Sequence, residues 1–376
     1  MKKKVKKKVK KKLGLVIGIC GVVLLAVGCG TSSSKKSAES SSKSDDNYVL
    51  KIADSSDLCS APQQIAIEQG FFDKEGLDYE LVKVGEDTSN FTAISTGQID
   101  ASNSLIGSVV QPLANGADIK ITTGLHTGCL QILVKKGSTI SSPEDLVGKK
   151  IGVSSVAGSP ATFAKRYLGD AGIDVSTENS EVEFVAYNSS DLAIVLENGT
   201  VDAIAFGDPT TEIIKDEYGF QTLASNATTD PYDEEYCCVA YVSANIAENH
   251  PEVAKKFTKA LQEASAWIDE NKAETAAIQL DKKYVDGDEA INLRSLESYN
   301  FIPSVSGAKK AIVQVAQDLQ DLDILDKSVD IKKLRDNSFL DLGLDDTASK
   351  SSASANKSTD KQVASGAKSS LANSHH

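Results

Sequence analysis

The sequence predicts an α/β protein of two lobes, joined by a hinge of two strands that cross between them. Strand signals alternate with helix signals along the body of the chain, a pattern typical of α/β layers. About 300 residues lie between polar end segments, which is too many for one simple core and suits two lobes. The stretch from Leu125 to Val134 joins an apolar strand to a second apolar run, and we interpret it as the first crossing.

The first 28 residues have the pattern of an export signal. Nine lysines precede an apolar run of 16 residues, which is short for a membrane span. Small residues stand directly before Cys29, as in the signal of bacterial lipoproteins. We therefore expect Cys29 to carry a lipid that holds the protein at the outer face of the bacterial cell membrane. A plain signal anchor with an incidental cysteine is the alternative.

Both ends of the exported chain lack apolar periodicity. Residues 29–47 are rich in Ser and Lys and predict a flexible tether, and residues 346–376 predict a disordered tail. The net charge of −13 becomes −22 when the nine lysines leave with the signal. Such a charge excludes a general nucleic-acid surface and gives no long-range attraction for anions.

Cysteine and histidine usage argues against a metal centre. Of six cysteines, Cys20 leaves with the signal and Cys29 is the anchor, so Cys59, Cys129, Cys237 and Cys238 remain. No CxxC spacing occurs, and the body contains two histidines. We therefore expect neither structural zinc nor a cofactor.

Strands and helices alternate up to the first crossing. Ser60 suits the N-cap of a helix with Pro62 in its first turn, and Asn103-Ser104 suits the cap of a later helix. The expected strands cover residues 48–53, 77–84, 99–102 and 119–123. The expected helices cover residues 60–70, 88–96 and 104–115.

The same alternation continues beyond the crossing. Ser142-Pro143 begins one capped helical turn, Pro160 and Pro209 each stand at the start of a helix, and residues 237–242 predict a second crossing strand. The other expected strands cover residues 150–153, 182–185, 201–205 and 220–224. The remaining helices are expected at residues 160–171, 189–198, 251–270, 273–284, 288–296 and 304–322.

Two crossings divide the chain into a discontinuous lobe and an inserted one. We predict lobe 1 from residues 48–128 and 239–345, and lobe 2 from residues 129–236. Two lobes joined by a two-strand hinge can close on a ligand.

Four segments resemble a known family. They are Gln64 to Leu77 (QIAIEQGFFDKEGL), Ser95 to Ala101 (STGQIDA), Ser142 to Val153 (SPEDLVGKKIGV) and Asn198 to Ala203 (NGTVDA). In this order and spacing they are similar to the nitrate/sulfonate/taurine class of ABC-transporter substrate-binding proteins, over about residues 48 to 345. The resemblance implies a type II periplasmic-binding-protein fold and a monomer that delivers a small molecule to an ABC permease with its cytoplasmic ATPase.

Ligands of open α/β lobes lie beyond the carboxyl ends of strands, where helix N-termini present free N–H groups. Family members also use these loops for ligand. The candidate ligand-binding residues are Cys59, Ser60, Asn103, Ser104, His126, Thr127, Cys129, Ser154, Ser155, Ser159, Asn188, Asp208, Tyr236 and Cys238.

Several candidates have an ordinary structural alternative. Ser154-Ser155 with Ser159 could cradle an anion, or Ser could cap its own helix. Asp208 could accept a hydrogen bond from a ligand amine or cap the next helix, and Tyr236 could line the cleft or fill the core. None of the three arginines falls in a predicted cleft loop, which argues against a small inorganic anion without excluding it.

Three interpretations of the four cysteines remain open. They could be small buried hydrophobic residues, or two of them could form a disulfide, since export permits oxidation. They could also face the ligand, and with His126 grip a soft metal. Cys237 and Cys238 are neighbours on a strand, so we expect their side chains to face opposite ways and at most one to reach the ligand.

The sequence therefore predicts a solute-binding protein rather than an enzyme. Its ligand would be a small organic molecule of the nitrate/sulfonate/taurine or thiamine-precursor-like class. The alternatives are capture of a soft metal or metal complex by the cleft Cys and His residues, or an enzyme on the same fold. The enzyme would have to use Cys129 with His126, three residues apart in one loop.

Overall fold

The computed structural model describes residues 48–85 and 88–344. The predicted signal, the lipid site at Cys29, the tether and the tail from residue 346 lie outside the described residues. Within the described ranges, no helix is both long and apolar enough to cross a membrane.

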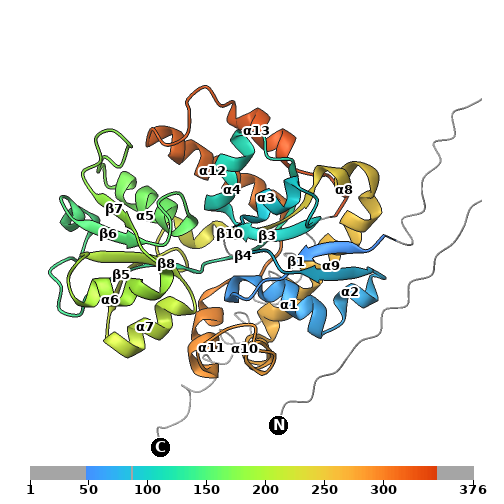
Figure 1. The fold of residues 1–376 in the computed structure, drawn as a ribbon, viewed down its shortest axis with the longest axis horizontal. Helices are drawn as coiled ribbons and strands as arrows, with labels where there is room; N and C mark the ends of the chain where they lie inside the picture. Colours follow the sequence, from blue (N-terminus) through green and yellow to red (C-terminus); the bar gives the residue numbers. More distant parts are fainter. Residues whose placement is uncertain (1–47, 86–87, 345–376) are drawn as a thin grey trace, which may run out of the picture. The chain divides into compact units, whose positions relative to one another are not determined.

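The core contains two separate five-stranded sheets, with helices on both faces of each (Figure 1). The first sheet has the order β2-β1-β3-β10-β4. Its strands are β1 (Leu50–Ala53), β2 (Tyr79–Val82), β3 (Ala101–Leu105), β4 (Ile119–Thr127) and β10 (Tyr236–Ser243). β10 returns from the far part of the chain and runs antiparallel between β3 and β4.

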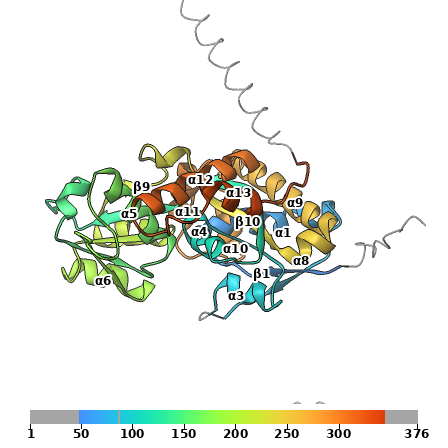
Figure 2. The same cartoon turned by 90° about the horizontal axis from the view of Figure 1, so that it is seen from above.

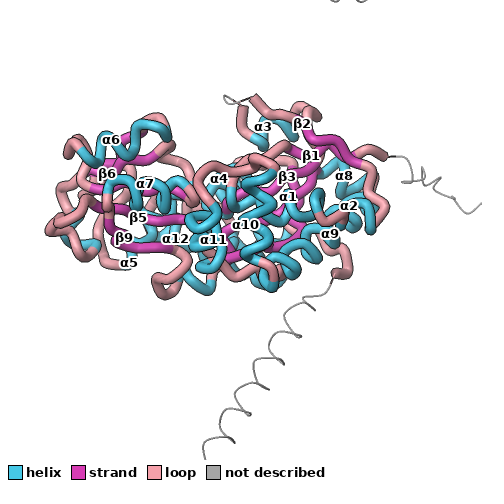
Figure 3. Tube along the Cα trace, turned by 90° about the horizontal axis from the view of Figure 1, so that it is seen from below, coloured by secondary structure: helices cyan, strands magenta, loops and turns pink. Residues whose placement is uncertain are grey.

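The second sheet has the order β7-β6-β8-β5-β9, and Figure 3 shows its strands as a group apart from β1 to β3. Its strands are β5 (Leu130–Val134), β6 (Lys150–Val153), β7 (Glu183–Ala186), β8 (Ala203–Gly207) and β9 (Gln221–Ser225). In each sheet two neighbouring strand pairs are parallel, β1 with β2 and β3, and β6 with β7 and β8. Parallel pairs direct their carboxyl ends to one edge, where ligands of open α/β sheets bind.

Ten helices accompany the first sheet in the part of the chain that the structure describes, and α10 and α11 among them pack on other helices. Figure 2 shows α12 and α13 on the same side as α4, against which both pack. These helices are α1 (Ala61–Glu68), α2 (Phe71–Lys74), α3 (Asn90–Ser95), α4 (Ile106–Ala114), α8 (Ala244–Asn249), α9 (Pro251–Glu270), α10 (Lys272–Asp281), α11 (Glu289–Ser298), α12 (Val305–Asp321) and α13 (Ile331–Ser338). The second sheet is covered by α5 (Ser159–Asp170), α6 (Leu192–Glu197) and α7 (Thr210–Tyr218).

The predicted alternation of strands and helices is present, but two cap assignments were wrong, and Ser60, which does occupy the N-cap position of α1, makes no capping bond with its side chain. Asp57, not Ser60, accepts the capping N–H at the helical turn Leu58–Ser60 that leads into α1. Asn103 and Ser104 lie inside β3, and α4 begins only at Ile106. The rule that Ser and Asn favour caps failed because both side chains have hydrogen-bond partners in the folded chain, Ser60 for Asn103 and Tyr241 for Ser104.

The chain first passes from one sheet to the other between β4 and β5. Gly128 and Cys129 both have positive φ, 84° and 106°, and together they make the bend. A Cβ on Gly128 would lie 2.7 Å from Cδ1 of Tyr299, so this position requires glycine for space as well as for conformation. Cys129 is not glycine, and its backbone is strained here.

The chain passes back to the first sheet where β10 begins, and Tyr236 is closely packed there. The ring of Tyr236 lies between Gly124 on β4 and Gly307 on α12, where added Cβ atoms would come within 2.5 Å and 2.2 Å of it. The hydroxyl of Tyr236 donates to the carbonyl of Ile302. Tyr236 is therefore packed between elements of the first sheet.

Candidate functional site

A cavity of about 480 Å³ lies between the two sheets, at the carboxyl ends of their central parallel strands. On the side of the first sheet, Asp57 and Cys59 follow β1, and Asn103 and Ser104 end β3. On the side of the second sheet, Ser154 follows β6 and Asp208 follows β8. The position agrees with the general rule for open α/β sheets.

The cavity has a polar and an apolar part. Leu105, Leu130, Phe206 and Val285 supply apolar surface. The polar lining residues are Ser55, Ser56, Asp57, Asn90, Asn103, Ser104, Ser108, Ser154, Asp208, Thr210 and Asp286, and the thiols of Cys59 and Cys238 also reach it. A volume of several hundred Å³ with apolar walls suits a small organic molecule.

A second depression, of about 620 Å³, lies away from this cavity. It is lined by residues 148–184 of the second sheet and its surroundings alone, among them Lys149, Glu181 and Phe184. Because it touches neither crossing nor the first sheet, it could not sense closure of two lobes, and we take the cavity between the sheets as the candidate site.

Six of the predicted ligand-binding residues line this cavity: Cys59, Asn103, Ser104, Ser154, Asp208 and Cys238. Four others lie close behind its wall. Ser60 is buried and donates to Asp57, and Thr127 accepts from the side chain of Asn300. His126 and Cys129 are fully buried.

The remaining four predicted residues lie away from the cavity wall. Ser155 and Asn188 are exposed on loops that do not line it. Ser159 is the first residue of α5, beside the second sheet. Its hydroxyl lies 2.7 Å from that of Ser108 on α4, beside the first sheet. Tyr236 occupies the glycine-lined position described above.

Asp208 is the most connected side chain of the cavity wall. Its Oδ1 accepts from Gln131 at 2.8 Å and from the hydroxyl of Thr211, and its Oδ2 accepts from the hydroxyl of Tyr299 at 2.8 Å. Burial raises the pKa of Asp208 to about 6, although these hydrogen bonds favour the carboxylate. Asp208 thus ties the second sheet to Tyr299, which follows α11 beside the first sheet.

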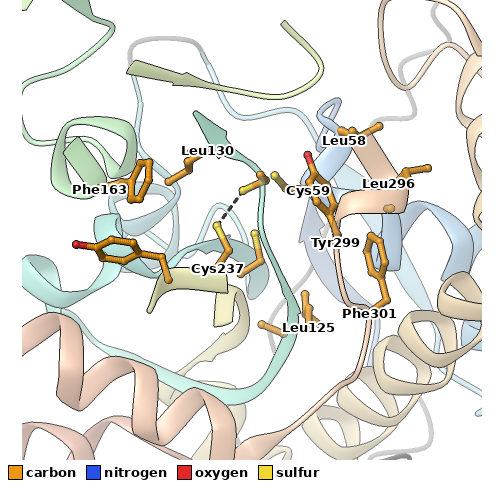
Figure 4. Packing of buried hydrophobic residues seen from close by; sticks show 14 of the residues in the cluster. Leu58, Cys59, Leu125, Leu130, Phe163, Cys237, Leu296, Tyr299 and Phe301 are labelled. Carbon is orange, nitrogen blue, oxygen red and sulfur yellow. Dashed lines mark hydrogen bonds between the residues drawn. The ribbon is translucent and has the colours of Figure 1, made fainter. Parts of the chain in front are cut away.

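The four cysteines of the body are free thiols that converge at the cavity wall. Figure 4 labels Cys59 and Cys237 of this group. The sulfur atoms of Cys129 and Cys237 are 2.8 Å apart, and both lie within 4.8 Å of the sulfur of Cys238. Cys59 approaches the same group from the turn before α1, and its sulfur lies within 4.8 Å of that of Cys238.

The expectation that Cys237 and Cys238 face opposite ways was wrong. The pairing of β10 with β4 shifts register on both sides of Cys238, so the regular alternation of side chains is lost there. As a result both thiols join one cluster. Cys238 lines the large cavity, whereas Cys237 lines a separate small pocket of about 40 Å³.

Both ring nitrogens of His126 lie against backbone carbonyl oxygens. Its Nδ1 lies 3.0 Å from the carbonyl oxygen of Thr127, and its Nε2 lies 3.1 Å from that of Cys59. The ring stacks on Tyr299 with centroids 5.5 Å apart. A ring N–H that donates to a carbonyl is not available to activate a thiol, so this arrangement does not favour a Cys129–His126 catalytic pair. One ring nitrogen of His126 does lie within 4.8 Å of the sulfurs of Cys59 and Cys238, a spacing at which the three side chains could hold a metal ion.

Cys59 is expected to react with iodoacetamide before Cys129. It lies in the cavity wall, and hydrogen bonds from Cys129 and Cys238 lower its pKa to about 7. Burial raises the pKa of Cys129, which is fully enclosed. Peptide mass spectrometry after short labelling should find Cys59 modified before Cys129, at a rate that rises through pH 7. Labelling of Cys129 first would contradict the arrangement.

Sequence comparisons agree with this geometry. The sequence model described as "NMT1/THI5 like" matches residues 60–275, which is more than half of the chain. The chain belongs to the NMT1/THI5-like family. A Bacillus subtilis protein provisionally named as binding aliphatic sulfonates is 27% identical over 348 residues, covering 89% of this chain and 98% of the relative. The taurine-binding periplasmic protein of Escherichia coli is 26% identical over 210 residues, covering 54% of this chain and 62% of the relative.

Solved structures confirm the predicted type II periplasmic-binding-protein fold of this family member. The periplasmic aliphatic sulphonate binding protein SsuA of Escherichia coli superposes with a TM-score of 0.64. The match covers 78% of this chain and 97% of SsuA at 18% sequence identity, so it establishes the fold.

Proposed function

We propose that this chain is the extracytoplasmic solute-binding lipoprotein of an ABC importer. Its two lobes, residues 48–128 with 239–345 and residues 129–236, close on a small organic molecule of the nitrate/sulfonate/taurine or thiamine-precursor-like class. The monomer, anchored by a lipid on Cys29, then delivers the molecule to a permease with its cytoplasmic ATPase. The observation that carries the proposal is the cavity of about 480 Å³ with walls from both sheets, beside both crossings.

The relatives support binding rather than catalysis. The family members compared above are named for the solutes that they bind, not for a reaction. These relatives do not favour capture of a soft metal.

The proposal is tested by the ligand that the protein carries. Native mass spectrometry of protein purified from its own host should show one bound small molecule, and dialysis against denaturant followed by refolding should lower the melting temperature by removing it. No retained molecule, together with no thermal shift on returning a small-molecule extract of the host, would count against a binding function.

A matched pair of variants connects binding to this cavity. Ser154→Trp places a large side chain in the cavity wall, and Ser155→Trp places the same side chain on the next residue, which is exposed but does not line the cavity. We expect Ser154→Trp to lose the bound molecule and Ser155→Trp to keep it. Equal retention by both variants would place the ligand elsewhere.

A further inference from the structure

The charge of the cavity differs from what an anion would require. Three carboxylates line it, from Asp57, Asp208 and Asp286, and no Lys, Arg or His is among its lining residues in the described part of the chain. Bound anions in proteins are usually held by charge-assisted bonds from basic side chains. Here an anion would meet three negative groups without a compensating cation, in a chain whose net charge is also negative.

A helix N-terminus could still attract an anion, and α5 begins beside Ser154. The second residue of α5 is Pro160, which lines the cavity and has no N–H to donate. The hydroxyl of Ser159 is bonded to Ser108 rather than directed at the cavity. The end of α5 thus lacks two of the donors that an anion cradle would use.

Asn103 shows which kind of hydrogen bond the cavity offers. The backbone N–H and the hydroxyl of Ser60 both donate to Oδ1 of Asp57, at 2.8 Å and 3.0 Å. Because the proton of Ser60 is used in this way, its oxygen can only accept, and it accepts from Nδ2 of Asn103 at 3.1 Å. This chain of bonds fixes the orientation of the Asn103 amide.

The fixed amide leaves an acceptor without a partner in the cavity wall, at an atom with almost no accessible surface. Asn103 lines the cavity with 7% of its surface exposed, and its Oδ1 is buried without a hydrogen-bond partner among the described residues. A buried acceptor without a partner is costly. A small movement of the wall when the ligand binds would let a ligand donor reach Oδ1 of Asn103 and satisfy it. The carboxylates of Asp57 and Asp286 add further acceptors at the same wall.

Apolar surface completes the site. Leu105, Leu130, Phe206 and Val285 can enclose a hydrocarbon or aromatic body, which a bare inorganic ion lacks. Resting on the solute-binding function proposed above, we propose that the cavity binds a small organic cation that carries an N–H group, such as a protonated amine or an amidine. The N–H donates to Oδ1 of Asn103, and the positive charge lies among the three carboxylates.

Matched ligand panels test the inference. Alkylamines and alkylguanidines are compared with alkylsulfonates and alkylcarboxylates of the same chain lengths, and with nitrate, by thermal shift and calorimetry on the purified protein. Binding by cations and not by anions is the expected result. Binding by anions alone would overturn the inference and leave the solute-binding function intact. Binding by neither class would also overturn the inference, and the solute-binding function would then be decided by the native mass spectrometry described above.

Variants identify the groups that recognise the charge and the donor. Asn103→Leu removes the acceptor and is expected to raise the Kd of the best cationic probe about tenfold. Asp286→Asn removes one exposed carboxylate and is expected to raise the Kd of this probe about threefold at low salt and less at high salt. Glu217→Gln, which removes an exposed charge on α7 outside the cavity, is the control and should leave the Kd unchanged. Tighter binding by Asp286→Asn would overturn the inference.

Discussion

Replacing Arg166 with Met is expected to lower the free energy of unfolding by about 3–5 kcal/mol. Arg166 lies on α5, and its side chain is 7% exposed. Its Nη1 and Nη2 bond both oxygens of Glu235, at 2.8 Å and 2.9 Å, and its Nε bonds Asp318 on α12 at 2.6 Å. Methionine fills similar volume but leaves two mostly buried carboxylates facing each other without a cation.

The control for this prediction is Arg335→Met. Arg335 lies on α13 and pairs with its exposed neighbour Asp336, so its loss is expected to change the free energy of unfolding by about 0.5 kcal/mol or less. Urea titrations followed by circular dichroism give both values. A similar small effect at both positions would show that Arg166 is not the link between α5 and α12 that its bonds indicate.

Asp208→Asn is expected to remove a pH dependence of stability between about pH 4 and pH 6. The pKa of Asp208 is raised from 3.8 to about 6, mainly by burial, so the folded chain holds this proton more tightly than the unfolded chain. Stability therefore falls as pH rises through this range, because the folded state binds more protons there. The decrease in the free energy of unfolding is complete above about pH 6 and amounts to about 3 kcal/mol, at 1.36 kcal/mol per pKa unit.

The measurement compares the free energy of unfolding of the wild type and Asp208→Asn from pH 4 to pH 7. We expect the wild-type value to decrease relative to the variant by about 3 kcal/mol over this range. Tyr299→Phe provides a second arm, because it removes a hydrogen bond that favours the carboxylate and should move the transition to higher pH. Parallel curves for the wild type and Asp208→Asn would contradict the burial of this charge.

Much of the fold was predictable because its signals are local. The alternation of apolar strands with capped helices places β4, the bend at Gly128 and β5 in their correct order. The four family segments predicted the fold class, which the solved structures confirm. The cavity lies at the ends of β1, β3, β6 and β8, where the general rule for open α/β sheets expects a ligand.

The composition of the cavity wall was less predictable, because it depends on distant segments. Val285 and Asp286 follow α10 and reach the cavity through the packing of the C-terminal helices, so no local pattern marks them. Asp57 could have been found, since it immediately precedes the helical turn after β1 and has the side chain of a good cap. The interpretation of Ser60 as the cap concealed it.

The cysteines show a different limit of sequence reasoning. Their positions at strand ends and in loops were recognised, and all four are buried free thiols, as one of the three open interpretations has them. The convergence of Cys237 with Cys238 was missed because it depends on a shift of register between β10 and β4. Strand periodicity assumes regular pairing, and the sequence does not signal where the pairing becomes irregular.

The position of Tyr236 between Gly124 and Gly307 constrains how this chain can vary. Neither glycine can gain a side chain while the ring is present, because the new Cβ would overlap it. A larger residue at 307 therefore requires a smaller one at 236, so substitutions at these two sites are coupled. At 124 a smaller residue at 236 is not sufficient, because the added Cβ would also lie 2.9 Å from the carbonyl oxygen of Ser304. The second crossing thus accepts a loss of volume at 236 more readily than a gain of volume at either glycine.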